Sequence, residues 1–432
     1  MKEMSNFQIG LIIIFILSLV LGLGLFATQK SGLGEGSASL LIWGTIPEDT
    51  FNNVYKASSI AKNKKVAVTY VRKDSADFDD KFIEALADGV GPDIVILRQD
   101  SIYTHRNKIF VVPYENFSQR NFKDIFIEDG EIFLTTKGIT AFPFIIDPMV
   151  MYWNRDMFSN NLISSPPKYW DEFYGLIDKV TRKDSSGNIM QSALSLGEWK
   201  NVTNAKSIFS LLLLQAGTPI VSYTDSAGYK SVLSSQLNYT IAPGQSALNF
   251  YTQFSNPTSV YYTWNRSLPS SLNFFLSSNL ATYVGFASEL FSIQQKNPNL
   301  NFDVTYVPQI RTAKNMSNFA NIYGLSIVKQ SKAIGAAFLL VTSLVEPDAL
   351  KVLESKTNLP PVRRDLLADK PTDAYRSVFY DSALISKSWV DPSPVNTTEI
   401  FKTMVESVTS GQQRVSEAIL KASDSIDSLF KK

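Results

Sequence analysis

The stretch DPMVMYWNRDMFSNN, residues 147–161, places the carboxylate of Asp147 before an apolar run that ends in Tyr152 and Trp153. A carboxylate can accept hydrogen bonds from the hydroxyl groups of a ligand, and with a second acid such as Asp100 it could hydrolyse a glycosidic bond. Hydrolysis needs one acid of raised pKa facing the other carboxylate, and nothing in the sequence singles out such a pair. Side chains alternate along a strand, so at most one of the two aromatic rings can reach a cleft; we expect core packing for either.

Composition excludes several other kinds of chemistry. The 432 residues contain no cysteine and one histidine, His105, so disulfides, thiolate nucleophiles, iron–sulfur clusters and histidine-rich metal sites are excluded. We expect His105 to be a structural residue in a surface segment, and we expect neither a cofactor nor a metal. Lysine plus arginine (41) balances aspartate plus glutamate (40) without a long basic stretch, so nucleic acid is not an expected partner.

The N-terminal residues predict a membrane anchor. Residues 7–28 carry no charge and supply the roughly 20 apolar residues that a bilayer span needs. Leu25, two residues before Ala27, fits a signal-peptide cleavage site poorly, so we expect an uncleaved anchor, with cleavage as the alternative. The predicted order is a short segment 1–6, a transmembrane anchor 7–28 and a flexible linker 29–39, with single-pass attachment to the cell membrane and an extracytoplasmic body.

Strand and helix patterns alternate at the start of the body. Strands are predicted at 40–43, 65–71 and 92–97, with helical patterns between them. This alternation predicts a parallel sheet with helices on its faces, in which ligands bind beyond the carboxyl ends of the strands. The loops GTIPED and RQDS occupy that position, and their candidate ligand contacts are Thr45, Glu48, Arg98 and Asp100.

Five segments resemble one protein family. They read, in chain order, FPFIIDPMVMYWNRDMF, SSPPKYWDEF, FLSSNLATYVGFASEL, NIYGLSIV and TNLPPVRRDLL. In order and spacing they are similar to the extracytoplasmic solute-binding proteins of ABC importers, specifically the sugar-binding family that includes maltose-binding protein. The resemblance extends from about Leu40 to the C-terminus.

The resemblance implies an α/β, two-lobed, periplasmic-binding-protein-like fold of type II with a hinged cleft that closes on the ligand. The first lobe would comprise residues 40–146 plus 322–345, and the second residues 147–321 plus 346–432. We therefore expect a monomeric binding protein, not an enzyme, that captures a carbohydrate, preferably an oligosaccharide, and delivers it to ABC permease subunits.

The expected ligand contacts come from the resemblance and from residue type. By resemblance, Asp100 and Asp147 match acidic ligand contacts, and Arg98 could share the role of Asp100. Phe286 and Glu289 flank a helix start whose free amides can bind a polar ligand. Exposed tryptophans in loops of the second lobe are expected to stack on sugar rings. The full set is Thr45, Glu48, Arg98, Asp100, Asp147, Trp199, Trp264, Phe286, Glu289, Tyr323 and Trp389.

Departures from the family pattern leave the ligand open. The segment GFASEL lacks the tryptophan that maltose-binding protein carries just after the glycine, and Tyr283 replaces a methionine. Peptides, polyamines or metal chelates are therefore alternative ligands. A secreted glycoside-acting enzyme and a ligand sensor are the alternative functions.

Overall fold

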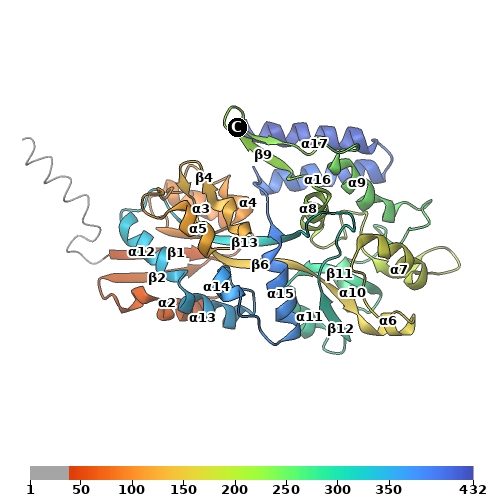
Figure 1. Cartoon of the computed structure of the whole chain (residues 1–432), viewed down its shortest axis with the longest axis horizontal. Coiled ribbons are helices and arrows are strands. Elements are labelled where there is room, and N and C mark those ends of the chain that lie inside the picture. Colours follow the sequence, from red (N-terminus) through yellow and green to blue (C-terminus); the bar gives the residue numbers. More distant parts are fainter. Residues whose placement is uncertain (1–37, 432) are drawn as a thin grey trace, which may run out of the picture.

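The computed structural model describes residues 38–431, which form two lobes side by side along the long axis of the molecule (Figure 1). Within this range, no helix is both long and apolar enough to cross a membrane. The predicted segment 1–6, the predicted anchor 7–28 and residues 29–37 of the predicted linker lie outside the described residues. Strand β1 begins at Ala38, so the last two residues predicted for the linker belong to the folded body.

The first lobe contains the parallel strands that the sequence predicts. They are β1 (Ala38–Gly44), β2 (Val66–Arg72) and β3 (Ile94–Arg98), paired in the order β2-β1-β3. Parallel strands cannot be joined by tight turns, so α2 (Glu48–Ala57) and α3 (Phe78–Ala87) provide the crossover connections. This arrangement directs the ends of β1 and β3, with the loops that follow them, to the same edge of the sheet.

Further helices complete the first lobe, and one boundary differs from the prediction. The additional elements are α4 (Gln99–Ile102), α5 (Gln119–Ile125), β4 (Leu134–Thr135), β5 (Gly138–Ile139), α12 (Ile334–Leu344), α13 (Pro347–Thr357) and α14 (Arg364–Leu367). The sequence assigned residues from 346 onward to the second lobe. That assignment is wrong for α13 and α14, because Leu350, Leu353 and Leu367 pack in the core of the first lobe together with Phe51 of α2.

Two long strands cross between the lobes near the centre of Figure 1. They are β6 (Phe142–Asn154) and β13 (Asn318–Ile327), which pair antiparallel in the first lobe. The second half of β6 pairs with β11 (Leu280–Phe286) and β12 (Phe302–Thr305) in the second lobe. Along β6, Ile146 belongs to the core of the first lobe and Met149 to that of the second. The pair Asp147–Pro148 therefore lies where one core ends and the other begins.

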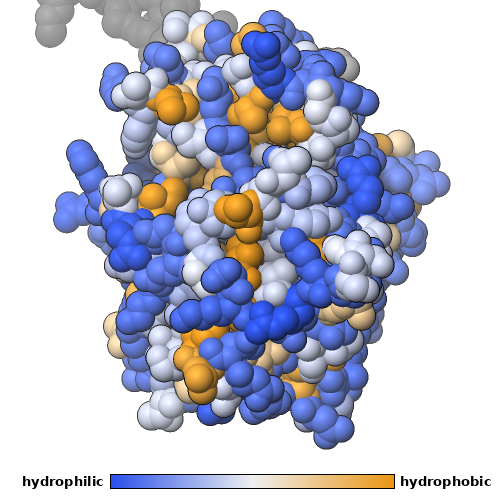
Figure 2. Space-filling view, turned by 90° about the vertical axis from the view of Figure 1, so that its right-hand side faces the viewer, coloured by the Kyte–Doolittle hydropathy of each residue, from blue (hydrophilic) through white to orange (hydrophobic). Residues whose placement is uncertain are grey.

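The second lobe combines the far end of the sheet with a helical layer. Its other strands are β7 (Arg182–Lys183), β8 (Ile189–Leu194), a hairpin of β9 (Val221–Thr224) and β10 (Gly228–Ser231), and β14 (Ser386–Lys387), which pairs with β13. Its helices are α6 (Arg155–Asn160), α7 (Phe173–Val180), α8 (Ala205–Ala216), α9 (Pro243–Thr252), α10 (Ser271–Leu276), α11 (Glu289–Lys296), α16 (Pro394–Thr409) and α17 (Val415–Phe430). Helix α15 (Ala374–Leu384) lies against both lobes, because Phe379 packs in one core and Tyr380 in the other. Figure 2 shows separate hydrophobic patches among hydrophilic residues on the outer side of the second lobe.

Two predictions about individual side chains have clear outcomes. Tyr152 is fully buried and donates a hydrogen bond of 2.7 Å to the carbonyl oxygen of Phe286, so the prediction that it packs in the core is confirmed. The predicted surface position of His105 is wrong: its side chain is fully buried. The turn after α4 folds back on α3, where the His105 ring contacts Phe82 edge to face and Nε2 lies 2.7 Å from Oδ1 of Asp79.

Candidate functional site

Asp147 lies at the crossing of the two lobes, and only 7% of it is exposed. Its carboxylate accepts hydrogen bonds from the backbone amide (3.0 Å) and the hydroxyl (2.6 Å) of Ser288, just before α11. Burial raises the pKa of Asp147 to about 7, the Ser288 hydrogen bonds oppose this rise, and the charge of Glu289 adds to it. The carboxyl group is thus anchored at the crossing of the lobes, and its charge is only partly compensated.

The first lobe contributes an ion pair at the end of β3. Arg98 donates from Nε and Nη2 to the two carboxylate oxygens of Asp100, at 2.8 and 2.6 Å. Arg98 pairs in register with Tyr323 of β13, and burial raises the pKa of the Tyr323 hydroxyl while the Arg98 charge lowers it. Three of the predicted contacts therefore lie together. A bidentate pair of this kind presents oriented donors and acceptors to a polar ligand.

On the second lobe, a polar network holds Glu289 at the start of α11. Its carboxylate accepts hydrogen bonds from the Tyr283 hydroxyl (2.6 Å), the Asn204 side-chain amide (2.7 Å) and the Phe286 backbone amide (2.9 Å). Asn204 precedes α8 in a left-handed conformation with φ of 62°, which asparagine tolerates better than most residues. Three donors from different elements thus fix the orientation of this acid.

A second ion pair faces the first across the lobes. Lys206 of α8 lies 2.7 Å from Asp391 and also donates to Thr397 Oγ1 at 2.8 Å. Burial raises the pKa of Asp391, the Lys206 charge lowers it, and the charge of Asp100 raises it further. Asp100 and Asp391 therefore repel each other between the lobes, and each has its own basic partner.

The family model described as bacterial extracellular solute-binding protein matches residues 55–379, more than half of the chain. The chain belongs to the bacterial extracellular solute-binding proteins. The resemblance that the sequence indicated is confirmed. A search of curated proteins finds no match.

Solved structures show the same fold as this solute-binding protein. A cyclo/maltodextrin-binding protein complexed with maltotetraose has a TM-score of 0.73 at 17% identity, covering 93% of this chain and 99% of that one. The cyclic alpha-maltosyl-1,6-maltose binding protein from Arthrobacter globiformis also scores 0.73, at 15% identity, covering 92% and 100%. The GacH receptor of Streptomyces glaucescens, solved unliganded and with acarbose, scores 0.68 at 16% identity, covering 92% and 100%. At these identities the likeness establishes the two-lobed α/β fold.

The loop tryptophans of this solute-binding protein are not the exposed side chains that the sequence predicted. Trp264 is fully buried and donates from Nε1 to Asn201 Oδ1 at 3.1 Å, and Trp199 is also buried. The loops that carry them pack on one another, because Asn201 also donates to the carbonyl oxygens of Asn265 and Leu268. The predicted exposure is wrong, so these rings offer no free face for stacking.

The remaining predicted contacts are buried to different degrees. Phe286 is buried in the core and takes part through its backbone amide. Trp389 is also buried, with Nε1 donating to Ser210, and its ring centre lies 5.8 Å from the Lys206 ammonium. Thr45 is half-buried, whereas Glu48 is exposed in the first turn of α2, where it accepts a bond from the Arg72 amide at 3.4 Å. Ligand contact by these residues stays a prediction.

The charged and polar side chains described above form a polar cluster, and sequence reasoning missed several of its residues. They are Asn204, Lys206, Ser288 and Asp391. Ser288 had a usable signal, because it directly precedes the acidic start of a predicted helix. Asp391 also had a usable signal, because it directly precedes Pro-Ser-Pro. At the beginning of α16 its carboxylate accepts hydrogen bonds from the Ser393 amide and the Thr397 hydroxyl. No local pattern indicated that Lys206 would meet it.

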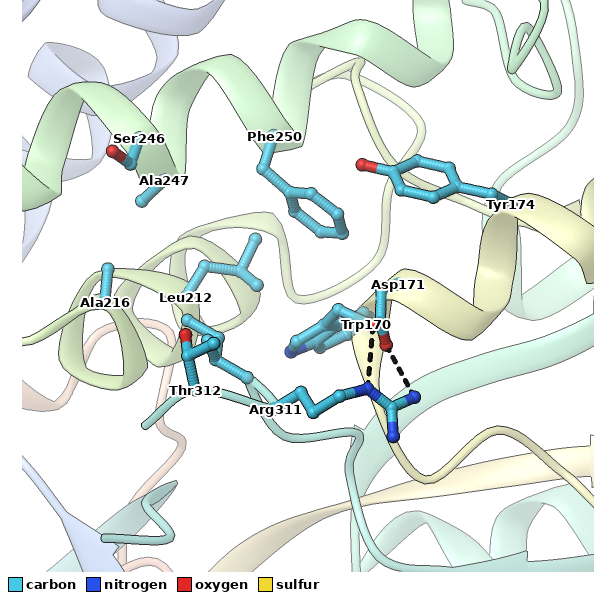
Figure 3. A pocket seen from close by; sticks show the side chains of 11 residues that line it. Trp170, Asp171, Tyr174, Leu212, Ala216, Ser246, Ala247, Phe250, Arg311 and Thr312 are labelled. Atoms are coloured by element: carbon cyan, nitrogen blue, oxygen red, sulfur yellow. Dashed lines mark hydrogen bonds and ion pairs between the residues drawn. The ribbon is translucent and has the colours of Figure 1, made fainter. Parts of the chain in front are cut away.

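Two cavities on the outside of the second lobe share no residue with this cluster. One, of about 310 Å³, is lined by Trp170, Tyr174 and Phe250 and bordered by Arg311 and Asp171 (Figure 3). A neighbouring cavity of about 690 Å³ shares Arg311. Arg311 is already held by Asp171 at 2.8 Å and by Glu172 at 2.9 Å, and the Trp170 indole donates to Gln215. With these polar groups occupied, the cavities carry no sign of a specific ligand.

Proposed function

We propose that this solute-binding protein captures an oligosaccharide between its lobes and delivers it to the permease of an ABC transporter. One observation carries the proposal: charged groups of both lobes converge where β6 and β13 cross. Arg98 and Asp100 come from the first lobe, Lys206 and Asp391 from the second, and Asp147 from the crossing itself.

The chemistry of these groups suits a ligand rich in hydroxyl groups. The oxygens of Asp100 and Asp147 accept hydroxyl hydrogens, while Arg98 donates to hydroxyl oxygens. Tyr323, half-buried beside Arg98, offers a ring for the apolar face of a sugar. Similar folds whose structures contain maltotetraose or acarbose support this ligand class.

Capture requires no covalent step. A ligand that contacts both lobes binds the closed form better than the open form, so it shifts the hinge equilibrium toward closure. The permease then distinguishes the closed from the open form. In this proposal the protein acts as a monomer, with residues 7–28 anchoring it to the membrane and its body on the extracytoplasmic side.

Thermal stabilisation tests the ligand class. Residues 38–432, which contain both cores, are screened against maltooligosaccharides, peptides and polyamines. A ligand present at one hundred times its Kd stabilises the folded state by about 2.7 kcal/mol, which is a clear shift in Tm. We expect an oligosaccharide to give this shift; if only a peptide or a polyamine does, the carbohydrate assignment is wrong.

A pair of variants locates the site. Asp147→Asn should weaken oligosaccharide binding by at least tenfold, because a charged acceptor is lost. Asp171→Asn, at the outer cavity, is the matched control and should leave the Kd unchanged. Equal effects would place the ligand elsewhere, and turnover of the sugar by the wild-type protein would contradict a binding-only function.

A further inference from the structure

An aromatic contact joins the two lobes near the C-terminal end of α17. Tyr103, which follows α4 in the first lobe, meets the rings of Tyr229 and Phe430 in the second lobe edge to face, at centroid distances of 5.5 and 5.0 Å. Tyr229 and Phe430 stack on each other at 5.6 Å. Figure 1 shows the C-terminal end of α17 lying over β9 and directed toward the first lobe.

The position of Tyr103 connects this contact with the proposed ligand site. Tyr103 follows Asp100 by three residues, about one helical turn, so the two side chains project from the same side of the segment. The Arg106 guanidinium lies over the Tyr103 ring at 4.0 Å and its Nη1 donates to the Tyr103 carbonyl at 2.8 Å, which holds this turn in place. The next residue, Thr104, donates across the lobes to the Pro392 carbonyl at 3.4 Å.

Electrostatics alone does not draw the lobes together at this point. The charge of Asp100 in the first lobe raises the pKa of Asp391 in the second, so these two carboxylates repel each other. Contact among the three aromatic rings offsets this repulsion. It removes apolar surface from water, and each edge-to-face pair contributes a favourable interaction beyond that burial.

We propose that Tyr103, Tyr229 and Phe430 form an aromatic latch that favours the closed over the open arrangement of the lobes before any ligand binds. The latch is a conformational device distinct from ligand binding. It limits the fraction of time in which the cleft is open to solvent, and a ligand is admitted when the latch opens. The existence of the latch does not depend on which solute the cleft holds.

Spin labels on the two lobes test the latch without a ligand. The chain contains no cysteine, so Val90→Cys in the first lobe and Val260→Cys in the second, 66% and 85% exposed, accept labels without background. Inter-label distances are measured by double electron–electron resonance on the full-length chain in a detergent without a sugar headgroup. We expect a mainly closed distance with a minor open one in the wild type, and in Tyr103→Ala a larger share of the longer distance, with the closed-to-open ratio lowered roughly tenfold.

Controls separate the ring contact from general damage. Tyr103→Phe retains the ring and should reproduce the wild-type distances. Phe430→Ala leaves the Tyr103–Tyr229 contact in place and should open the cleft less than Tyr103→Ala does. The double variant should open it no further than Tyr103→Ala, because that change already removes both ring contacts between the lobes. Leu420→Ala, at an exposed position of α17, should leave the distances unchanged. The latch is overturned if the ligand-free wild type is already open, or if Tyr103→Ala leaves the distances unchanged. Neither result would bear on whether the protein binds a sugar.

Discussion

The two lobes hold the charged groups of the proposed ligand site in different ways. In the first lobe, Arg98 and Asp100 are two residues apart and bond each other, and the acid, Asp100, is 13% exposed. In the second lobe, Lys206 meets an acid 185 residues later in the chain, and the Asp391 side chain is 1% exposed. The first pair is a local feature that a ligand can reorganise at low cost. The second connects α8 to the segment before α16 and contributes to the folding of its lobe.

The largest expected effect concerns two buried acids that each accept a hydrogen bond from a serine hydroxyl, Asp147 at the crossing and Asp129 in the first lobe. Burial raises the pKa of Asp147 to about 7, whereas an unfolded aspartate has a pKa of about 3.9. Between pH 4 and pH 7 the folded protein binds a proton at Asp147 that the unfolded chain lacks. The stability that this proton contributes is fully present below about pH 4 and is lost as the pH rises through 7. Asp147→Asn cannot titrate; its stability relative to wild type should therefore rise by up to about 4 kcal/mol from pH 4 to pH 8.

Urea denaturation at a series of pH values measures this difference. Asp129 is a useful parallel, because burial also raises its pKa to about 7 and its carboxylate accepts the Ser388 hydroxyl at 3.0 Å. Asp129→Asn should give a similar slope. A difference that does not change with pH would show that the acid in question titrates normally.

The next effect distinguishes the two ion pairs directly. Lys206→Met leaves Asp391 buried without its cation, which should lower the free energy of unfolding by about 3 kcal/mol. Adding Asp391→Asn should restore most of this loss, since the neutral amide needs no counter-charge. If the single variant is as stable as wild type, the Lys206–Asp391 pair is not part of what holds the second lobe together.

The less buried pair of the first lobe should respond less strongly. Arg98→Ala should cost less stability than Lys206→Met does, about 1 kcal/mol, because water reaches Arg98 and Asp100 more than it reaches Lys206 and Asp391. Its effect on ligand Kd, measured by calorimetry, should exceed its effect on stability. A large loss of stability with unchanged Kd would reverse the comparison between the lobes.

The smallest effect is expected at the outer cavity of the second lobe. Arg311 is half exposed and bonds two acids that are also exposed. Arg311→Ala should leave the Kd for the ligand unchanged and shift Tm less than Lys206→Met does. A loss of binding in this variant would indicate that the outer cavity takes part in function.

Prediction from sequence succeeded where the signal is local. The strands β1, β2 and β3 were predicted because each is a short run rich in aliphatic and β-branched residues, and the run is longest where β3 is buried on both faces. The position of Arg98 and Asp100 was predicted for the same reason, since the loop after a parallel strand lies at a fixed edge of the sheet. Their proximity to Tyr323 follows from the pairing of β3 with β13.

Prediction failed where burial depends on distant partners. Trp264 stands in a polar loop and was expected to be exposed, yet Asn201 provides a partner for its indole. A loop can be buried when its polar groups are satisfied by another loop, and no local pattern reveals this. The assignment of α13 failed similarly, because its apolar face packs on α2, almost 300 residues earlier in the chain, and no local pattern indicates that partner.

The sequence by itself determined the order of elements, the family and the position of Asp147 at the passage between lobes. These follow from hydrophobic periodicity and from short motifs, both of which are properties of neighbouring residues. Only the tertiary structure decided that Lys206 meets Asp391, that two tryptophans are buried, and that Tyr103 meets Phe430. Each of these contacts joins residues far apart in the chain, where geometry depends on the packing of whole elements.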